Sequence, residues 1–306
     1  MAKLRSERAA IAALTRAPNT ERAYASDWAD FSAWCERAGR RALPATSDSV
    51  QLYLMELAGL GRLPATMSRR VSAIRERHRA AGLRTPIDED VREVLLGLRR
   101  KLGAAPKHAK AALTIADLRR MLKRVPDDLR GARDRALMLV GFASGLRRSE
   151  LASLNLADVR FERRGCVISL GRSKTDQEGE GRDVGVHKGR HRETCPVAAL
   201  RAWIMERGPW PGALFASIDQ HGSLRRRSMD SAQVAEAVKL AAKRVGLDPD
   251  LFGAHSLRAG LVTAAGGNGV GTLAIMSRTG HRDAKVVQRY MRPGTALAVD
   301  PLAGLL

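Results

Sequence analysis

The sequence predicts a mainly α-helical protein with a small β-hairpin or sheet, divided into two domains. The chain has 306 residues, which is more than a single hydrophobic core usually serves. Aromatic residues make up only 4% of it, and Leu, Ala and Val supply most of the apolar side chains, a balance that favours helices over sheets. Apolar residues recur at helical spacing along most of the chain, whereas a strand pattern is clear at only one place.

Residues 1–103 are expected to form a small, all-helical domain. Apolar spacing indicates four helices, which run from Asn19 to Gly39 with Thr20 as N-cap, from near Ser47, from near Thr66 to before Gly82, and from about Asp88 to Leu102. The third of these helices is strongly cationic outside its apolar face, with Arg69, Arg70 and Arg75 among its arginines. Such a helix suits contact with a phosphate backbone, although a solvated basic face is the plain alternative.

A short basic segment follows this domain. Residues 104–112 break the helical periodicity, contain Pro106, and add Lys107 and Lys110 without any acid, so we interpret them as a linker. Residues 1–103 carry 19 basic and 12 acidic side chains, and the rest of the chain carries 34 and 20. Because both parts are cationic, we expect both to contact one polyanion, with the two linker lysines passing over it.

The overall charge points to the same kind of partner. The chain has 53 Lys and Arg against 32 Asp and Glu, a formal net charge of +21. Such an excess is typical of proteins that bind nucleic acid or an anionic membrane, or that keep a solvated basic surface. No apolar run has the length of a membrane span, and the three cysteines are too widely spaced for a disulfide framework or a cysteine zinc site. We therefore expect a cytoplasmic protein that binds nucleic acid and no membrane.

Residues 113–306 are expected to form a second domain of helices with one hairpin. Helices are expected at residues 114–124, 131–143, 149–154, 196–207 and 231–245. Residues 166–170 and 182–187 read as two strands around a polar turn that contains glycine.

Two motifs of this domain combine a cation with a turn or a helix start. Arg147 and Arg148 lie in GLRRSEL, at a helix junction with Ser149 as the expected cap, where arginines can hold a phosphate bidentately. Lys174 lies in GRSKT, at the hairpin turn. Taken singly, an arginine beside a cap and a lysine in a turn are usually solvated surface residues.

Two further motifs place histidines near the C-terminal end. His255 and Arg258 are spaced i, i+3 at the start of a helix, so both can face one anion. His281 follows a glycine and stands nine residues before Tyr290. A capping histidine and a core tyrosine are the ordinary explanations, but the order and spacing of all four motifs together are not generic.

The four motifs together resemble the tyrosine recombinases, also called phage-type integrases. The segment NTERAYASDWADFSAWC is similar to the start of that family's core-binding domain. The resemblance implies an N-terminal DNA-binding domain in residues 1–103 and an α+β catalytic domain in residues 113–306. It implies a site-specific recombinase that cuts and rejoins double-stranded DNA through a covalent 3′-phosphotyrosyl link, without metal or another cofactor, as a tetramer on paired sites.

The resemblance also implies roles for single residues. Tyr290 matches the nucleophile, Arg147 and Arg258 match the arginines that clamp the phosphate, and Glu150 matches the acid that supports the first of them. His255 matches the histidine of the H-x-x-R pair, His281 the later His/Trp position, and Lys174 the hairpin lysine that acts as general acid. Cationic donors are what an in-line attack on a phosphodiester needs, and a tyrosine becomes a usable nucleophile when cations lower its pKa.

Other interpretations stay open. Lys188 is another lysine close to the hairpin. His187, His191 and Cys195 are spaced i, i+4, i+8, as metal ligands on a helix would be, but Gly189 argues against that helix. Two functional alternatives are a DNA-binding protein of the same fold without catalysis and an enzyme similar to type IB topoisomerases. The apolar tail of residues 296–306 is expected to dock on a neighbouring protomer, unless it is frayed.

Overall fold

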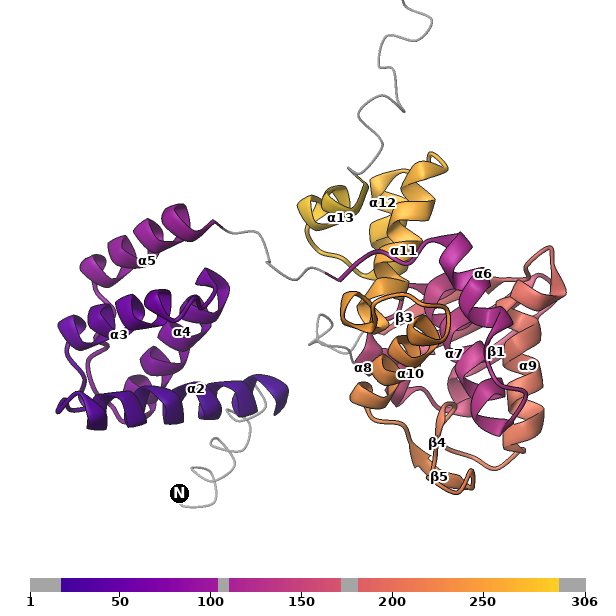
Figure 1. The fold of residues 1–306 in the computed structure, drawn as a ribbon, viewed down its shortest axis with the longest axis horizontal. Helices are drawn as coiled ribbons and strands as arrows, with labels where there is room; N and C mark the ends of the chain where they lie inside the picture. Colours follow the sequence, from indigo (N-terminus) through magenta and orange to yellow (C-terminus); the bar gives the residue numbers. More distant parts are fainter. Residues whose placement is uncertain (1–17, 104–109, 172–180, 292–306) are drawn as a thin grey trace, which may run out of the picture. The chain divides into compact units, whose positions relative to one another are not determined.

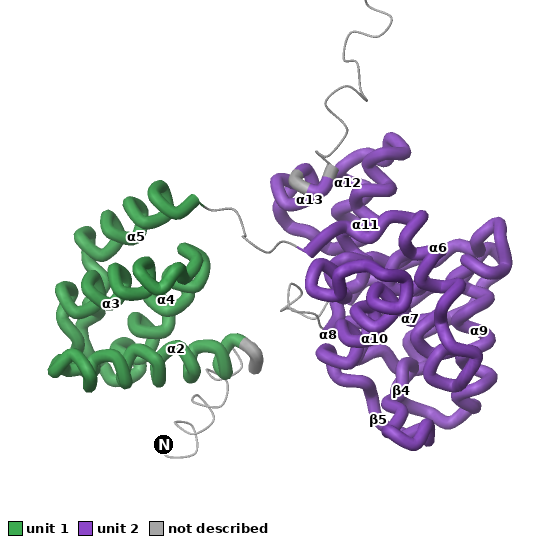
Figure 2. Tube along the Cα trace, in the orientation of Figure 1, with its two compact units in different colours: residues 1–107 green, residues 108–306 purple. Residues whose placement is uncertain are grey.

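The computed structural model describes residues 18–103, 110–171 and 181–291. The chain divides into two compact units, residues 1–107 and residues 108–306 (Figures 1 and 2). Within the described residues, no helix is both long enough and apolar enough to cross a membrane.

Unit 1 consists of helices around one small core. They are α2 (Pro18–Arg37), α3 (Ser47–Gly59), α4 (Pro64–Ala80) and α5 (Glu89–Leu102). The prediction of four helices is confirmed, and Asp88 caps the last by accepting the N–H of Val91. The expected cap at Thr20 is wrong, because α2 already includes Pro18 and Thr20 lies inside its first turn. Phe31, Tyr53 and Met67 are fully buried between these helices.

Unit 2 combines helices with two small antiparallel sheets. Its helices are α6 (Ile115–Lys123), α7 (Leu129–Ser144), α8 (Arg148–Ser153), α9 (Pro196–Arg207), α10 (Ser231–Arg244), α11 (Ala254–Gly267), α12 (Thr272–Thr279) and α13 (Ala284–Met291). The strands are β1 (Val159–Glu162), β2 (Gly165–Leu170), β3 (Arg182–His187), β4 (Ala216–Ile218) and β5 (Leu224–Ser228), with order β1-β2-β3 in one sheet and β4-β5 in the other. Short 3-10 turns cover Leu156–Asp158, Arg192–Thr194 and Pro249–Leu251.

The five helices predicted in this unit are confirmed to within two residues, and so is the hairpin of β2 and β3. α7 begins two residues earlier than expected because Asp128 caps it, accepting the N–H of Gly131 at 2.6 Å. α8 differs in its cap. Arg147 rather than Ser149 is the N-cap, since the Arg147 N–H is bonded to the Glu150 carboxylate and the helix starts at Arg148.

α7 lies at the centre of unit 2 and places the elements that matter for function. Its residues Leu137, Met138 and Val140 are fully buried, and α9, α11 and β3 pack around the helix. α7 ends at Gly145, which has a φ of +66°. A Cβ at this position would come within 2.7 Å of the Leu261 side chain, so glycine is needed both for the left-handed turn and for the close approach of α11.

Candidate active site

The ends of several elements meet where α7 stops. The start of α8 supplies Arg147, the start of β3 supplies Arg182, and the start of α11 supplies His255 and Arg258. α12 ends at Gly280, directly before His281. α13, which carries Tyr290, packs against α11 and α12. In Figure 1, α11, α12 and α13 lie together at the upper left of unit 2.

The Glu150 carboxylate joins two arginines. Its Oε1 accepts from Nη1 of Arg147 at 2.6 Å, and its Oε2 accepts from the Arg147 backbone N–H at 2.8 Å and from Nη2 of Arg182 at 3.2 Å. Arg147 also donates from Nη2 to the Gly280 carbonyl at 3.0 Å, and Arg182 donates to the Arg278 carbonyl at 2.6 Å. These bonds fix both guanidinium groups against the end of α12.

Arg258 forms the deepest part of the cluster, with only 3% of the residue exposed. Its Nη1 donates to the carbonyls of Gly145 and Thr279 at 2.7 and 2.6 Å, and its Nε donates to Nε2 of His281 at 3.3 Å. The Thr279 hydroxyl donates its one proton to the Ile275 carbonyl, so it accepts from Nδ1–H of His281 at 2.6 Å. These partners define His281 as a neutral imidazole with its proton on Nδ1.

Tyr290 and His255 are in direct contact. The phenol oxygen lies 2.6 Å from Nε2 of His255, and the two rings meet edge to face with centroids 5.8 Å apart. The Thr263 hydroxyl donates to the Tyr290 carbonyl at 3.1 Å, which ties the end of α13 to α11. The tyrosine hydroxyl of this chain is therefore beside its own arginine cluster.

The electrostatics of the cluster are those of a buried site with an excess of positive charge. Burial, followed by repulsion from Arg147, lowers the pKa of Arg258 to about 10, and burial also lowers the pKa of Arg182. Burial and the adjacent Arg258 lower the pKa of His281 to about 4, and desolvation by the surrounding protein lowers the pKa of His255. Three arginines lie near the single carboxylate of Glu150, which is bonded to two of them, so an incoming phosphate would offset the remaining positive charge.

Arg182 is a residue of this cluster that sequence reasoning did not single out. Its guanidinium packs over Gly280, where a Cβ would lie 3.1 Å from the Arg182 Cζ. An arginine at the start of a strand is usually solvated, so its type alone gives no signal. Its position directly after the hairpin turn that carries Lys174 is the one feature of the sequence that points to it.

The predicted hairpin lysine, Lys174, lies outside the described residues. The strand ends on either side of its turn do belong to the site region, because Leu170 pairs with Arg182 in the sheet. Lys188 lies just beyond the other end of β3. Six residues of extended chain separate it from Arg182, which corresponds to about 20 Å.

The residues predicted to contact DNA outside the cluster differ in their placement. Arg75 is exposed. Arg69 is half exposed and forms a bidentate pair with the buried Asp27, at 2.7 and 2.9 Å. Arg70 is 8% exposed and bonds to Asp30 and Tyr53. The expectation of a DNA contact conflicts with the burial of Arg70, because its guanidinium is already used inside unit 1.

The two linker lysines also differ. Lys107 lies outside the described residues. Lys110 is half-buried and its ammonium donates to the Asp250 carbonyl, so at least one of its donors is engaged within unit 2.

The three residues at the spacing of metal ligands are not brought together. The described residues contain no group of three His, Cys, Asp or Glu side chains suited to a metal ion, and His187, His191 and Cys195 are all among them. The Cys195 sulfur instead accepts the backbone N–H of Gly189, which follows β3, and that of Ala198 in the first turn of α9.

Comparisons with known proteins fit this geometry. A family model described as the phage integrase family matches residues 111–296. An integrase/recombinase XerD homolog from Selenomonas ruminantium is 36% identical over 285 residues, covering 92% of this chain and 83% of the relative. The recombinase Cre of Escherichia phage P1 is 25% identical, covering 86% and 80%.

Solved structures share the fold. The integrase of transposon Tn1549, bound to transposon right end DNA, has a TM-score of 0.68 with 17% identity, covering 92% of each chain. A lambda integrase dimer bound to a core site has a TM-score of 0.62 with 17% identity, covering 97% of this chain and 78% of that one.

Proposed function

This chain belongs to the phage integrase family, and from that membership we propose how its own residues cut and rejoin DNA. The protein is a tyrosine-type site-specific DNA recombinase. Because its substrate is DNA, we expect it to act in the cytoplasm. The reaction is a transesterification: the Tyr290 oxygen attacks the scissile phosphorus, the bond to the 5′ oxygen breaks, and a 3′-phosphotyrosyl link and a free 5′ hydroxyl result. Attack by a 5′ hydroxyl on this link reverses the step and rejoins the strands.

One observation carries the assignment of the nucleophile. The Tyr290 hydroxyl is 2.6 Å from a histidine nitrogen whose pKa is lowered, beside a cluster of arginines. His255 is then neutral near pH 7, and its Nε2 can accept the phenol proton as the oxygen attacks. Of the other two tyrosines, Tyr53 is buried in the core of unit 1, where desolvation raises its pKa well above the usual value.

The arginines supply charge stabilisation. Arg147 and Arg258 would bind the non-bridging oxygens of the phosphate, where negative charge builds in the pentavalent transition state. Glu150 and Arg182 act on Arg147, since the shared carboxylate fixes its guanidinium. His281 is a neutral hydrogen-bonding partner of Arg258 and orients it. This set is sufficient without a metal ion or another cofactor, so cleavage should continue in excess chelator.

Lys174 is proposed as the general acid that protonates the 5′ oxygen as it leaves. Its turn connects Leu170 to Arg182, and Arg182 is bonded to Glu150. Lys188 is the weaker candidate, because it follows the opposite end of β3, about 20 Å from Arg182.

The functional assembly is proposed to be a tetramer on paired DNA sites. A lambda integrase tetramer bound to a Holliday junction is among the solved structures of this fold, with a TM-score of 0.58. Residues 296–306, which are rich in Leu, are proposed to dock on a neighbouring protomer. Unit 2 offers an apolar recess of about 560 Å³ between β3, α11 and α12, lined by Leu261, Val270 and Ile275 among others. Deletion of residues 296–306 should impair assembly on DNA more than binding to a single site.

The test is the covalent adduct. Tyr290→Phe should bind a target duplex like the wild type and form no adduct that survives denaturant, because only the nucleophilic hydroxyl is lost. Adduct formation by this variant at the same site would move the nucleophile to Tyr24 or Tyr53. Absence of an adduct in the wild type would favour a DNA-binding protein without catalysis. Relaxation of supercoils by a monomer, without strand exchange, would favour a topoisomerase.

A further inference from the structure

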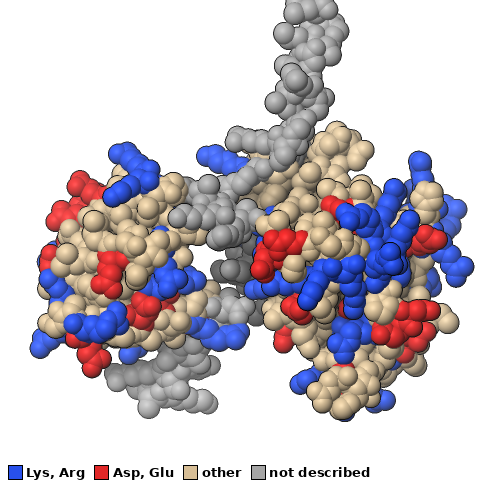
Figure 3. Space-filling model, in the orientation of Figure 1, with Lys and Arg blue, Asp and Glu red and all other residues tan. Residues whose placement is uncertain are grey.

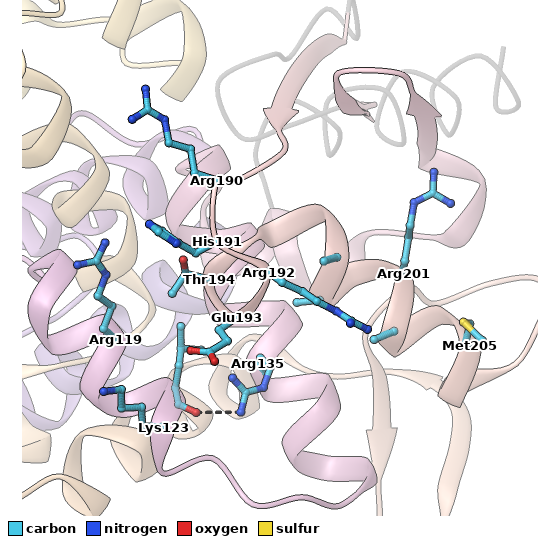
Figure 4. A pocket seen from close by; sticks show the side chains of 14 residues that line it. Arg119, Lys123, Arg135, Arg190, His191, Arg192, Glu193, Thr194, Arg201 and Met205 are labelled. Atoms are coloured by element: carbon cyan, nitrogen blue, oxygen red, sulfur yellow. Dashed lines mark hydrogen bonds between the residues drawn. The ribbon is translucent and has the colours of Figure 1, made fainter.

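A second basic surface lies in unit 2, apart from the catalytic cluster. It is a groove of about 1410 Å³ between α6, α7 and the segment from Arg190 to Met205 (Figure 4). Arg135 of α7 lines the groove, and Gly145, whose carbonyl accepts from Arg258, follows ten residues later. This separation corresponds to about 15 Å along the helix axis. The groove is therefore a feature separate from the catalytic cluster.

The charged side chains that line the groove are almost all cationic. Six Lys or Arg side chains contribute to it, namely Arg119, Lys123, Arg135, Arg190, Arg192 and Arg201. Glu193 is the only carboxylate among the lining residues, and none of the six cations forms an ion pair with a described residue. Lys and Arg also gather across the middle of the face of unit 2 that Figure 3 shows, where Asp and Glu form smaller groups. The charge excess predicts an anionic occupant.

Two of these cations are held in place before any partner binds. Nη2 of Arg135 donates to the Leu122 carbonyl at 2.9 Å, and the Arg201 guanidinium stacks on the Phe161 ring at 4.0 Å. Such fixed cations lose little freedom on binding an anion. Apolar side chains lie among them, including Leu122 and Met205, and Met205 is 83% exposed.

We propose that this groove binds an acidic peptide segment of a partner protein, in which Asp or Glu alternates with apolar side chains. The carboxylates of the peptide would pair with the arginines that line the groove, while its apolar side chains would cover Met205. The volume exceeds the usual size of a small-molecule pocket. Single-stranded nucleic acid is a poorer match, because no Phe, Tyr or Trp lines the groove for bases to stack on. Duplex DNA would contact the cations with its phosphates and leave the apolar part uncovered.

The direct test uses the full chain and a fluorescent 12-residue peptide, EELLEELLEELL, with the Gln-for-Glu peptide as the ligand control. The groove variant is Arg119→Ser, Arg190→Ser, Arg192→Ser. The matched variant removes the same charge from exposed positions elsewhere on unit 2, as Arg163→Ser, Arg164→Ser, Arg227→Ser. The groove variant should bind the acidic peptide at least about tenfold more weakly, and the matched variant less than about twofold, because only the first removes cations that line the groove. Equal weakening by both would overturn the proposal.

A second substitution changes the charge of the groove in the opposite direction. Glu193→Gln removes the one carboxylate of the groove, so it should strengthen peptide binding by about two- to fivefold. Glu236→Gln, at an exposed position of α10, should leave binding unchanged. A random-sequence 30-bp duplex serves as the competing ligand: if the groove variant lost more affinity for the duplex than for the peptide, the groove would be a DNA contact and the proposal would be wrong. Covalent adduct formation should keep its wild-type rate in the groove variant.

Discussion

Replacing Arg182 with methionine tests whether this residue positions the phosphate clamp. The substitution keeps a long apolar side chain over Gly280 and removes the guanidinium that bonds to Glu150 at 3.2 Å and to the Arg278 carbonyl at 2.6 Å. Glu150 would then hold Arg147 without its second arginine. We expect the rate of cleavage to fall and the affinity for DNA to stay unchanged, because Arg182 acts through Glu150.

The size of the effect follows from the bond that is lost. A hydrogen bond to a charged group contributes about 1.5–3 kcal/mol. If this energy acts in the transition state, the cleavage rate falls by about 10- to 150-fold. Arg182→Lys keeps the charge but loses the planar fork that reaches both acceptors, so it should recover only part of the rate.

The assay is single-turnover formation of the covalent adduct on a duplex with the recombination site, together with the Kd for the same duplex. Arg160→Met, at an exposed position of β1, is the matched control. The double variant Arg182→Met, Glu150→Gln distinguishes positioning through Glu150 from a merely structural role of Arg182. If Arg182 acts through Glu150, the double variant should be hardly slower than Glu150→Gln alone. Fully additive losses, or a rate for Arg182→Met within threefold of the wild type, would refute the reasoning.

Three other predictions concern the acid, a histidine and the DNA clamp. Lys174→Ala should slow cleavage by about 10²- to 10⁴-fold. DNA with sulfur in place of the bridging 5′ oxygen has a leaving group that needs no proton, so it should rescue this variant but not Arg147→Ala. Equal rescue of both variants would show that the general acid is another residue. His281 has a folded-state pKa of about 4, below its ordinary value of 6.5, so the unfolded chain binds more protons between these values and stability should fall as pH drops from 6.5 to 4. Tm measured against pH should show a smaller drop in His281→Asn, and an unchanged drop would contradict the assignment. Affinity for DNA should fall steeply with salt and be weaker for residues 104–306 alone; equal affinity of this fragment and the whole chain would exclude contacts by both domains.

The helices were predictable where local signals mark both ends. α9 runs from Pro196 to Arg207 as expected, because proline favours the first helical position and Gly208 follows the last. The strands β1, β4 and β5 were not predicted, since three to five residues give too short a pattern, and β5 consists mainly of exposed arginines.

The candidate site was predictable only in part. The motifs that contain Arg147, Arg258 and Tyr290 are recognisable in the sequence, and the structure brings these residues together. Arg182 was not found, because its role depends on a contact with Glu150, 32 positions earlier in the chain. The burial of Arg70 was missed for the same reason: its partners Asp30 and Tyr53 lie on other helices, and helical spacing within α4 does not reveal them.

The way α13 is attached has a consequence for control of the reaction. This eight-residue helix is held by Val287, which packs with Val262 and Ile275 in a cluster separate from the main core, and by the bond from Thr263. Full burial of a valine is worth about 1.5–3 kcal/mol. Displacing the helix would withdraw the nucleophile while leaving the rest of unit 2 folded. Only the docked helix places the Tyr290 hydroxyl beside His255, so the reactive geometry depends on a few contacts between α13 and its neighbours and not on the main core of unit 2.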